Sequence, residues 1–163
     1  MSGTTFFLCM VVVQMDYTYD QAKTACDLMP IIEQESYNNN IDPGLVVSII
    51  HVESAWRPNA VSARGACGLM QLVPTSHRTP SGKVYSCRQL KDPALNIRLG
   101  VEHLKKWIDL ANGEMPLALC VYHRGPKCFE DPSYHYIEKV VSVYGRFISE
   151  VVALGGSYEE GGG

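Results

Sequence analysis

One acidic residue, Glu53, stands where a carboxyl group could take part in proton transfer. It follows a mostly apolar run at 45–52 and precedes a segment, 57–86, that is rich in Gly, Pro, Ser and Thr. A carboxylate near the end of a buried helix costs free energy unless it has a use, and apolar neighbours such as Val52 and Trp56 favour the protonated form that a general acid needs. Glu53 is therefore a candidate catalytic acid. The alternative is a helix-end glutamate whose side chain simply reaches solvent.

The other residues that commonly bind metal ions show no ligand spacing. The sequence has no Cys-x-x-Cys and no His/Cys cluster with zinc spacing, and His77, His103 and His135 lie far apart in the chain. His51 precedes Glu53 by two residues, which puts it on a different face of a helix, and we interpret it as structural. We therefore predict no metal ion and no other cofactor.

The residues that follow Glu53 form a specific motif. Segment 53–75 has the sequence ESAWRPNAVSARGACGLMQLVPT. It resembles the signature of the soluble lytic transglycosylase (SLT) family, which has Glu-Ser, then Pro, then Ala-x-Ser, then Gly-Ala-x-Gly-Leu-Met-Gln, then Pro. Every one of these positions is matched in order and spacing, which makes the motif far more specific than Gly-Leu-Met-Gln alone.

Three downstream segments are similar to later elements of the same family. They are Asp92-Pro93 with Asn96-Ile97, Gly100 and Leu104; segment 118–126, with the sequence ALCVYHRGP; and Tyr136-Ile137 before Val140. Segment 118–126 resembles the family's Ala-Leu-Ala-Ala-Tyr-Asn-Ala-Gly-Pro element, but it has His123-Arg124 in place of Asn-Ala. The resemblance covers 41–147 and leaves the first forty residues and the tail outside.

The resemblance implies a lysozyme-like α fold with a groove for a peptidoglycan glycan strand. It implies that Glu53 is the catalytic residue and that six other residues bind substrate: Ser62, Met70, Gln71, Tyr122, His123 and Tyr136. Ser62 would hydrogen-bond near Glu53 or the substrate, and the two tyrosines would flank the cleavage point. The family's Asn at the position of His123 generally helps to hold the substrate, and a histidine could donate a comparable hydrogen bond. The alternative for the tyrosines is ordinary core packing.

The reaction that the resemblance implies needs one carboxylate. A lytic transglycosylase cuts the MurNAc-GlcNAc β-1,4 bond without water and leaves 1,6-anhydroMurNAc ends. A hydrolysing muramidase on the same fold would need a second carboxylate, for which Asp92, Glu130 and Asp131 are candidates. A third alternative is a non-catalytic glycan-binding or structural component of a phage particle or secretion channel, and the intact Glu53 argues against it.

Apolar periodicity and capping signals predict an all-α single domain. The expected helices span 18–37, 42–56, 92–113, 116–123 and 131–155, with an irregular segment at 57–86 that holds a short helical turn at 68–72 and a small β-hairpin. We predict an N-terminal helical extension at 1–40, a catalytic domain at 41–156 and a disordered tail at 157–163.

Charge and hydropathy limit the partners. The net charge of −3 gives no reason to expect nucleic-acid binding, and no apolar run approaches the ~20 residues of a spanning helix. Residues 51–106 hold nine Lys/Arg against three Asp/Glu, which suits an anionic polymer or simply solvated helix faces. The sequence indicates no particular protein partner.

The expected place of action is the periplasmic or extracellular cell wall, reached as a phage virion or lysis protein or in association with secretion. The apolar stretch 6–13 lacks a preceding Lys/Arg and a following Ala-x-Ala, so a cleaved signal peptide is poorly supported. The alternatives for this stretch are a buried strand or helix, or a mobile arm.

The six cysteines are expected to be mostly free and buried, because free Cys is a common small core residue. We expect Cys67 to pack beneath the turn at 65–71. Cys120 and Cys128 are the best candidates for a disulfide, since only a short Gly-Pro loop separates them.

Overall fold

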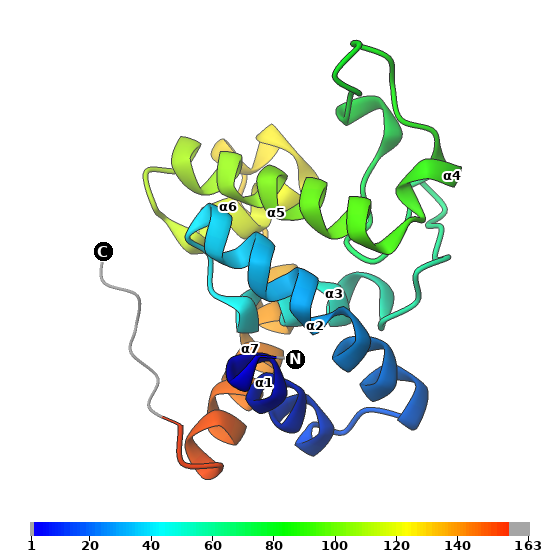
Figure 1. The fold of residues 1–163 in the computed structure, drawn as a ribbon. Coiled ribbons are helices and arrows are strands. Elements are labelled where there is room, and N and C mark those ends of the chain that lie inside the picture. Colours follow the sequence, from blue (N-terminus) through cyan, green and yellow to red (C-terminus); the bar gives the residue numbers. More distant parts are fainter. Residues whose placement is uncertain (1, 157–163) are drawn as a thin grey trace.

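The computed structural model describes residues 2–156, and helices dominate this range (Figure 1). The α-helices are α1 (Gly3–Gln14), α2 (Tyr19–Asn39), α3 (Pro43–Ser54), α4 (Cys87–Leu90), α5 (Pro93–Leu110), α6 (Met115–Arg124) and α7 (His135–Ala153). Two 3-10 helices, η1 (Pro74–Ser76) and η2 (Pro126–Phe129), lie in the connections. The prediction of an all-α single domain is confirmed. The tail that we predict to be disordered, 157–163, lies outside the described residues.

Three of the predicted helices begin with the side-chain caps that the sequence indicated. The Thr18 hydroxyl accepts from the Gln21 amide at 3.3 Å while the Gln21 side chain accepts from the Thr18 amide at 2.8 Å, which is a capping box. A carboxylate oxygen of Asp42 accepts from two amides at the start of α3, and Asp92 accepts from the Leu95 amide at 2.8 Å at the start of α5. Local hydrogen bonds therefore set where α2, α3 and α5 begin.

Helix α3 is the most deeply buried helix of the described part. All of its residues from Gly44 to Ile50 are buried, and it packs against α2 and α7. The contact with α7 is close at Gly44, where an added Cβ would lie 2.5 Å from the Phe147 ring. Helix α5 in turn packs against α2 and α6. The helix whose last turn carries Glu53 is thus held on several sides by apolar contacts.

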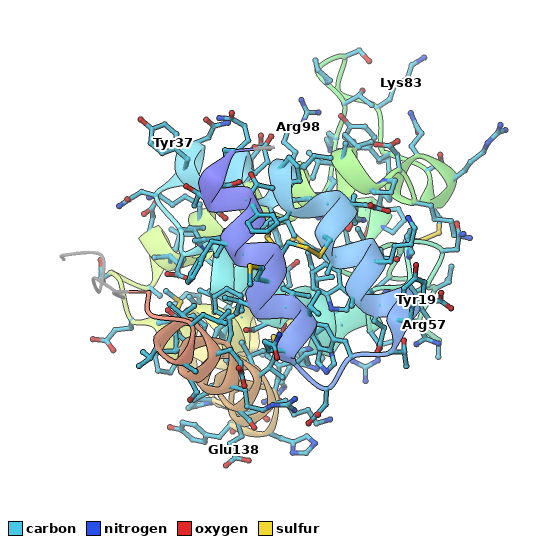
Figure 2. The ribbon with its side chains drawn as sticks, turned by 60° about the horizontal axis from the view of Figure 1, so that its bottom comes forward. Tyr19, Tyr37, Arg57, Lys83, Arg98 and Glu138 are labelled. Atoms are coloured by element: carbon cyan, nitrogen blue, oxygen red, sulfur yellow. A yellow bond between two sulfur atoms is a disulfide. The ribbon has the colours of Figure 1, made fainter. Side chains whose placement is uncertain are left out.

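The apolar stretch 6–13 lies within α1, which packs against α2 and α7 with Leu8, Val11 and Val12 buried. Figure 2 shows α1 running alongside α2. Of the alternatives for this stretch, the buried helix is the one that the structure shows. No helix among residues 2–156 is long and apolar enough to cross a membrane.

The irregular segment 57–86 is held by single bridges rather than by strands. Val61 bridges Cys67, Cys67 bridges Leu72, and Arg78 bridges Val84 to close a small hairpin near Lys83, which projects from the body of the molecule in Figure 2. The predicted helical turn at 68–72 is wrong, because Cys67 and Leu72 exchange two backbone hydrogen bonds, at 2.9 and 3.0 Å, and so enclose a tight turn.

The last helix begins later than we predicted. Asp131-Pro132 does not start it; α7 begins at His135. The amide of Asp131 donates to the Lys127 carbonyl at 2.9 Å, and the Arg124 guanidinium donates to the Asp131 carbonyl at 3.2 Å. The first bond ties Asp131 to η2 and the second ties it to α6. The Asp131 carboxylate lies 3.5 Å from the Arg124 guanidinium, and no side chain caps α7.

The expectation of mostly free thiols is wrong, because all six cysteines are paired. The disulfides are Cys9–Cys26, Cys67–Cys87 and Cys120–Cys128, with Cα–Cα distances of 4.9, 5.6 and 5.8 Å. The third is the one that we predicted. The other two join elements whose packing partners the sequence does not reveal, α1 with α2 and the irregular segment with α4. Cys67 is fully buried at the base of the 65–71 turn, as expected, but it is paired in a disulfide and is not a free thiol.

Candidate active site

Glu53 lies in the last turn of α3, as the sequence predicted. Its side chain is 12 % exposed. The next two residues after Ser54, Ala55 and Trp56, both have left-handed backbone conformations, with φ of 49° and 63°. Non-glycine residues adopt this conformation only at a cost in free energy, and here it turns the chain sharply away directly after the acid. The carboxyl group therefore sits at a fixed helix end with little access to water.

Two tyrosines lie near Glu53: Tyr122 from α6, which is partly buried, and Tyr136 from α7, which is buried. Burial raises the pKa of Tyr122 well above its ordinary value, and the negative charge of Glu53 raises it further. The pKa of Tyr136 is raised for the same reasons in the same order. The Tyr122 hydroxyl donates to the Met70 carbonyl at 2.8 Å. The Tyr136 hydroxyl lies close to Glu53, but within the described residues it has no partner at hydrogen-bonding geometry.

His123, at the end of α6, completes the surroundings of the acid. Its Nδ1 lies 3.6 Å from Oε1 of Glu53. Its ring stacks on the ring of Tyr136, with centroids 4.2 Å apart and planes 6° from parallel. The structure thus brings together four of the residues that the resemblance selected: Glu53, Tyr122, His123 and Tyr136.

Asn96 is the residue that ties the Gly-rich turn to α5. It is fully buried; its amide nitrogen donates to the carbonyls of Cys67 (3.0 Å) and Leu90 (2.6 Å), and its oxygen accepts from the Met70 amide at 2.7 Å. Gly68 has a φ of 81°, and a Cβ there would lie 2.3 Å from the Asn96 amide. This turn therefore needs both a glycine and a buried amide.

The other predicted substrate-binding residues lie on this turn and just before it. Met70 is fully buried, and its side chain packs against Gly100, so only its carbonyl, held by Tyr122, belongs to the surroundings of the acid. Gln71 is half-buried and its side chain donates to the carbonyl of Gly68 at 2.9 Å. The Ser62 hydroxyl accepts from the Ala66 amide at 3.0 Å. Substrate binding by these residues stays a prediction.

A cluster of aromatic rings beside Tyr122 was not predicted from the sequence. His77, from the irregular segment, and His103, from α5, have ring centroids 4.8 Å apart, and His103 accepts from the Trp107 indole N–H at 3.0 Å. Burial lowers the pKa of His103 to about 4, helped by the positive charges of His77 and Lys106. The spacing of His103 and Trp107, four residues apart on one helix, was a usable signal; nothing in the sequence places His77 beside them.

The acids that the sequence offered as a second carboxylate have other surroundings, whereas the charge of Glu53 raises the pKa of both Tyr122 and Tyr136. Asp92 caps α5, Asp131 lies 3.5 Å from Arg124 in an ion pair, and Glu130 is exposed.

A large cavity of about 1530 Å³ lies at the opposite end of α3 from the acid. Its lining includes Asp42, Leu45, Leu119, Ile137 and Val140, and it contains none of the predicted site residues. Its size alone therefore does not make it the catalytic site, because the chemistry-bearing side chains converge on Glu53 instead.

Fold and site together define a lysozyme-like all-α protein with one enclosed glutamate. The family model of the transglycosylase SLT domain matches residues 30–138, and the chain belongs to this family. The match begins inside α2. The division into an extension at 1–40 and a catalytic domain at 41–156 stays a prediction.

Relatives and solved structures agree with this membership. The chain is 38 % identical over 91 residues to an endo-type membrane-bound lytic murein transglycosylase A of Klebsiella pneumoniae (50 % of this chain, 43 % of the relative). It is 40 % identical over 86 residues to a membrane-bound lytic murein transglycosylase C of Haemophilus influenzae (49 % of this chain, 24 % of the relative). The chain spans less than half the length of these relatives.

Two solved structures share the fold. An inactive mutant of the lytic transglycosylase Slt of Pseudomonas aeruginosa has a TM-score of 0.63 at 24 % identity, covering 79 % of this chain and 24 % of that one. The 70 kDa soluble lytic transglycosylase of Escherichia coli has a TM-score of 0.58 at 19 % identity, covering 94 % of this chain and 29 % of that one.

Proposed function

We propose that this chain is a peptidoglycan lytic transglycosylase that cuts the MurNAc-GlcNAc β-1,4 bond, with Glu53 as its only acid/base. The observation that carries the proposal is the setting of Glu53, which is 12 % exposed and has two tyrosines and a histidine beside it. Names of relatives that include lytic murein transglycosylase support it.

In the first step, protonated Glu53 donates its proton to the glycosidic oxygen and the bond from that oxygen to C1 of MurNAc breaks. The N-acetyl carbonyl of the substrate stabilises the positive charge that develops at C1. In the second step the 6-hydroxyl oxygen of the same MurNAc attacks C1, and its proton passes to the Glu53 carboxylate. The products are a free 4-hydroxyl on GlcNAc and a 1,6-anhydro ring on MurNAc, with the acid regenerated and no water consumed.

The tyrosines fit this reaction as neutral hydrogen-bond donors. Their raised pKa keeps both hydroxyls protonated at any physiological pH, so neither competes with Glu53 as a base. The Tyr122 hydroxyl already donates to the Met70 carbonyl, whereas the Tyr136 hydroxyl lacks a described partner and is available to the glycan or to Glu53. Donors that are fixed before the substrate arrives stabilise developing charge without reorganisation.

A hydrolysing muramidase is the competing function. An inverting hydrolase needs a base ~6.5–9.5 Å from the acid, on the other face of the sugar, to activate water. Of the three acids that the sequence offered for this role, Asp92 caps a helix, Asp131 is in an ion pair and Glu130 is exposed.

Product analysis separates the two functions. Digestion of purified peptidoglycan by the protein should give fragments that are lighter by one water than muramidase fragments and that resist borohydride, because an anhydro ring has no reducing end. Glu53→Gln keeps the shape of the side chain but cannot shuttle a proton, and activity should fall by about 10²–10⁴-fold. Reducible, full-mass fragments would mean a hydrolase; a folded Glu53→Gln variant with near wild-type activity would mean that Glu53 is not the catalyst.

We further propose that the chain works outside the cytoplasm. Three disulfides in a small domain are typical of oxidising compartments. Of the predicted settings, a chain exported to the wall fits this pairing better than one that stays in a reducing cytosol until lysis. Alkylation in denaturant without reductant, followed by mass spectrometry of protein purified from its own compartment, should find no labelled cysteine; six labelled cysteines would contradict this proposal.

A further inference from the structure

One oxygen of the Glu53 carboxyl group lies close to a ring nitrogen of His123. Oε1 lies 3.6 Å from Nδ1 of His123. This distance is longer than an ordinary hydrogen bond, but contacts of catalytic groups are often long in the free enzyme and shorten when substrate closes the site. An approach of less than ~1 Å would make His123 Nδ1 a hydrogen-bonding partner of Oε1.

The orientation of the His123 ring is fixed by packing even though its side chain is 46 % exposed. Its plane lies 6° from that of Tyr136 at a centroid distance of 4.2 Å, and Tyr136 is only 5 % exposed. The stack brings the last turn of α6 against the first turn of α7. Because the ring cannot tilt without breaking this stack, the plane of the ring is set before any ligand binds, and in this structure Nδ1 lies on the edge that faces Glu53.

We propose that His123 is the positioning residue of Glu53 and acts by donating from Nδ1 to Oε1. This inference rests on the proposed function of Glu53. A donor at Oε1 makes that oxygen the carbonyl oxygen of the protonated acid, which leaves the proton on Oε2. The acid then presents its proton from one defined oxygen, and after the transfer the same N–H stabilises the carboxylate. The ring nitrogen Nε2 has no part in this contact.

Two amide substitutions test which ring nitrogen matters. The amide nitrogen of Asn occupies nearly the place of Nδ1 of His, and that of Gln nearly the place of Nε2. His123→Asn, the conservative variant that keeps a donor near the place of Nδ1, should retain more of the wild-type kcat than His123→Gln. His123→Gln, and His123→Phe, which keeps the stack on Tyr136 but has no donor, should lower kcat by about 10- to 10²-fold with KM little changed, because a misplaced acid slows the chemistry and not the binding.

The measurements are kcat and KM on a soluble glycan oligomer, with thermal unfolding to check that each variant folds. Equal kcat values for His123→Asn and His123→Gln would overturn the proposal. So would a loss in His123→Gln that appears in KM alone, since that is the signature of a substrate contact. If the wild-type protein gives no anhydro products, the proposed function fails; if it does and the Asn/Gln difference is absent, only the role of His123 fails.

An NMR measurement tests the same contact without turnover. Nitrogen NMR of the labelled histidine distinguishes the two neutral tautomers. The proposal expects the proton of neutral His123 on Nδ1 in the wild-type protein. A proton on Nε2 would overturn it, because Nδ1 would then have no hydrogen to donate to Oε1.

Discussion

The chain reaches Glu53 through two capped helices and leaves it through the irregular segment 57–86. Before the acid, α2 and α3 are held by near neighbours: the capping box at Thr18, the cap at Asp42 and an unbroken buried stretch from Gly44 to Ile50. After the acid, the backbone is held by distant partners: Asn96 on α5 and the disulfide between Cys67 and Cys87.

The difference shows how the molecule divides two tasks. A helix whose backbone hydrogen bonds join residues only a few positions apart holds the acid rigidly. The turn at 67–72 has no such run of helical backbone hydrogen bonds, so its polar groups are satisfied by side chains from elsewhere in the fold. Damage to one contact should therefore stay local before Glu53 and spread further after it. Four predictions test this contrast, in decreasing order of expected effect.

The largest effect is expected at Gly68. Gly68→Ala places a Cβ 2.3 Å from the Asn96 amide and 2.4 Å from the Leu90 carbonyl, in a backbone with a φ of 81°. We expect unfolding free energy to fall by about 4 kcal/mol, the sum of overpacking and left-handed strain. Gly65→Ala is the matched control, since it has a φ of 78° but nothing within 4 Å, and should lose about 1 kcal/mol. Urea unfolding measures the free energy of both variants. Equal losses would contradict the close approach of residue 68 to Asn96 and Leu90.

The disulfides allow the two regions to be compared directly. Replacing Cys67 and Cys87 by Ala, or Cys9 and Cys26 by Ala, opens loops of similar separation, 20 and 17 residues. Each pair should cost about 3 kcal/mol of stability. Below both unfolding transitions, only the first pair should also lower wall cleavage, because only that loop contains the turn beside Glu53. Equal wall cleavage by the two variants would show that the turn does not depend on the disulfide between Cys67 and Cys87.

A smaller effect should appear as pH dependence at the contact of His77 and His103. The pKa of His103 is about 4 in the folded chain and 6.5 ordinarily. Between these values the unfolded chain binds a proton that the folded chain does not, so stability is fully present above pH 6.5 and is lost as the pH falls toward 4. His103→Gln keeps an acceptor for Trp107 and should reduce this loss by about 2 kcal/mol at about pH 4.5. Parallel pH curves for the two proteins would show that His103 is not the cause.

The smallest effect is expected at the start of α2. Thr18→Ala removes the cap hydroxyl and should lower unfolding free energy by about 1 kcal/mol, with wall cleavage unchanged. Thr24→Ala, inside the same helix, serves as the control and should change stability by less than about 0.5 kcal/mol. A loss of wall cleavage in Thr18→Ala would contradict the comparison, because damage at the start of α2 would then reach the site.

The features that the sequence predicted best are those with local causes. The starts of α2, α3 and α5 follow from Thr18, Asp42 and Asp92, each of which caps residues two or three positions away. Glu53 was found because its helix and its motif are both contiguous in sequence. His123 was selected by its place in a motif, although its contact with Glu53 depends on how α6 and α7 pack.

The features that were missed or wrong depend on contacts across the fold. The pairing of Cys9 with Cys26 requires α1 to lie against α2, and the contact of His77 with His103 requires the irregular segment to fold over α5. The start of α7 is the exception, because Asp131 bonds to Lys127 and Arg124, which precede it by only four and seven residues. Short-range spacing does not encode the other two contacts.

The order of the disulfides has a consequence for how the chain matures. Each cysteine is joined to its immediate neighbour along the sequence, the first to the second, the third to the fourth and the fifth to the sixth. A chain that meets an oxidant from its N-terminus onward completes each bond as soon as the second partner emerges, before the next cysteine can compete. Vectorial oxidation of this kind gives the native set directly, with no rearrangement of wrongly joined pairs.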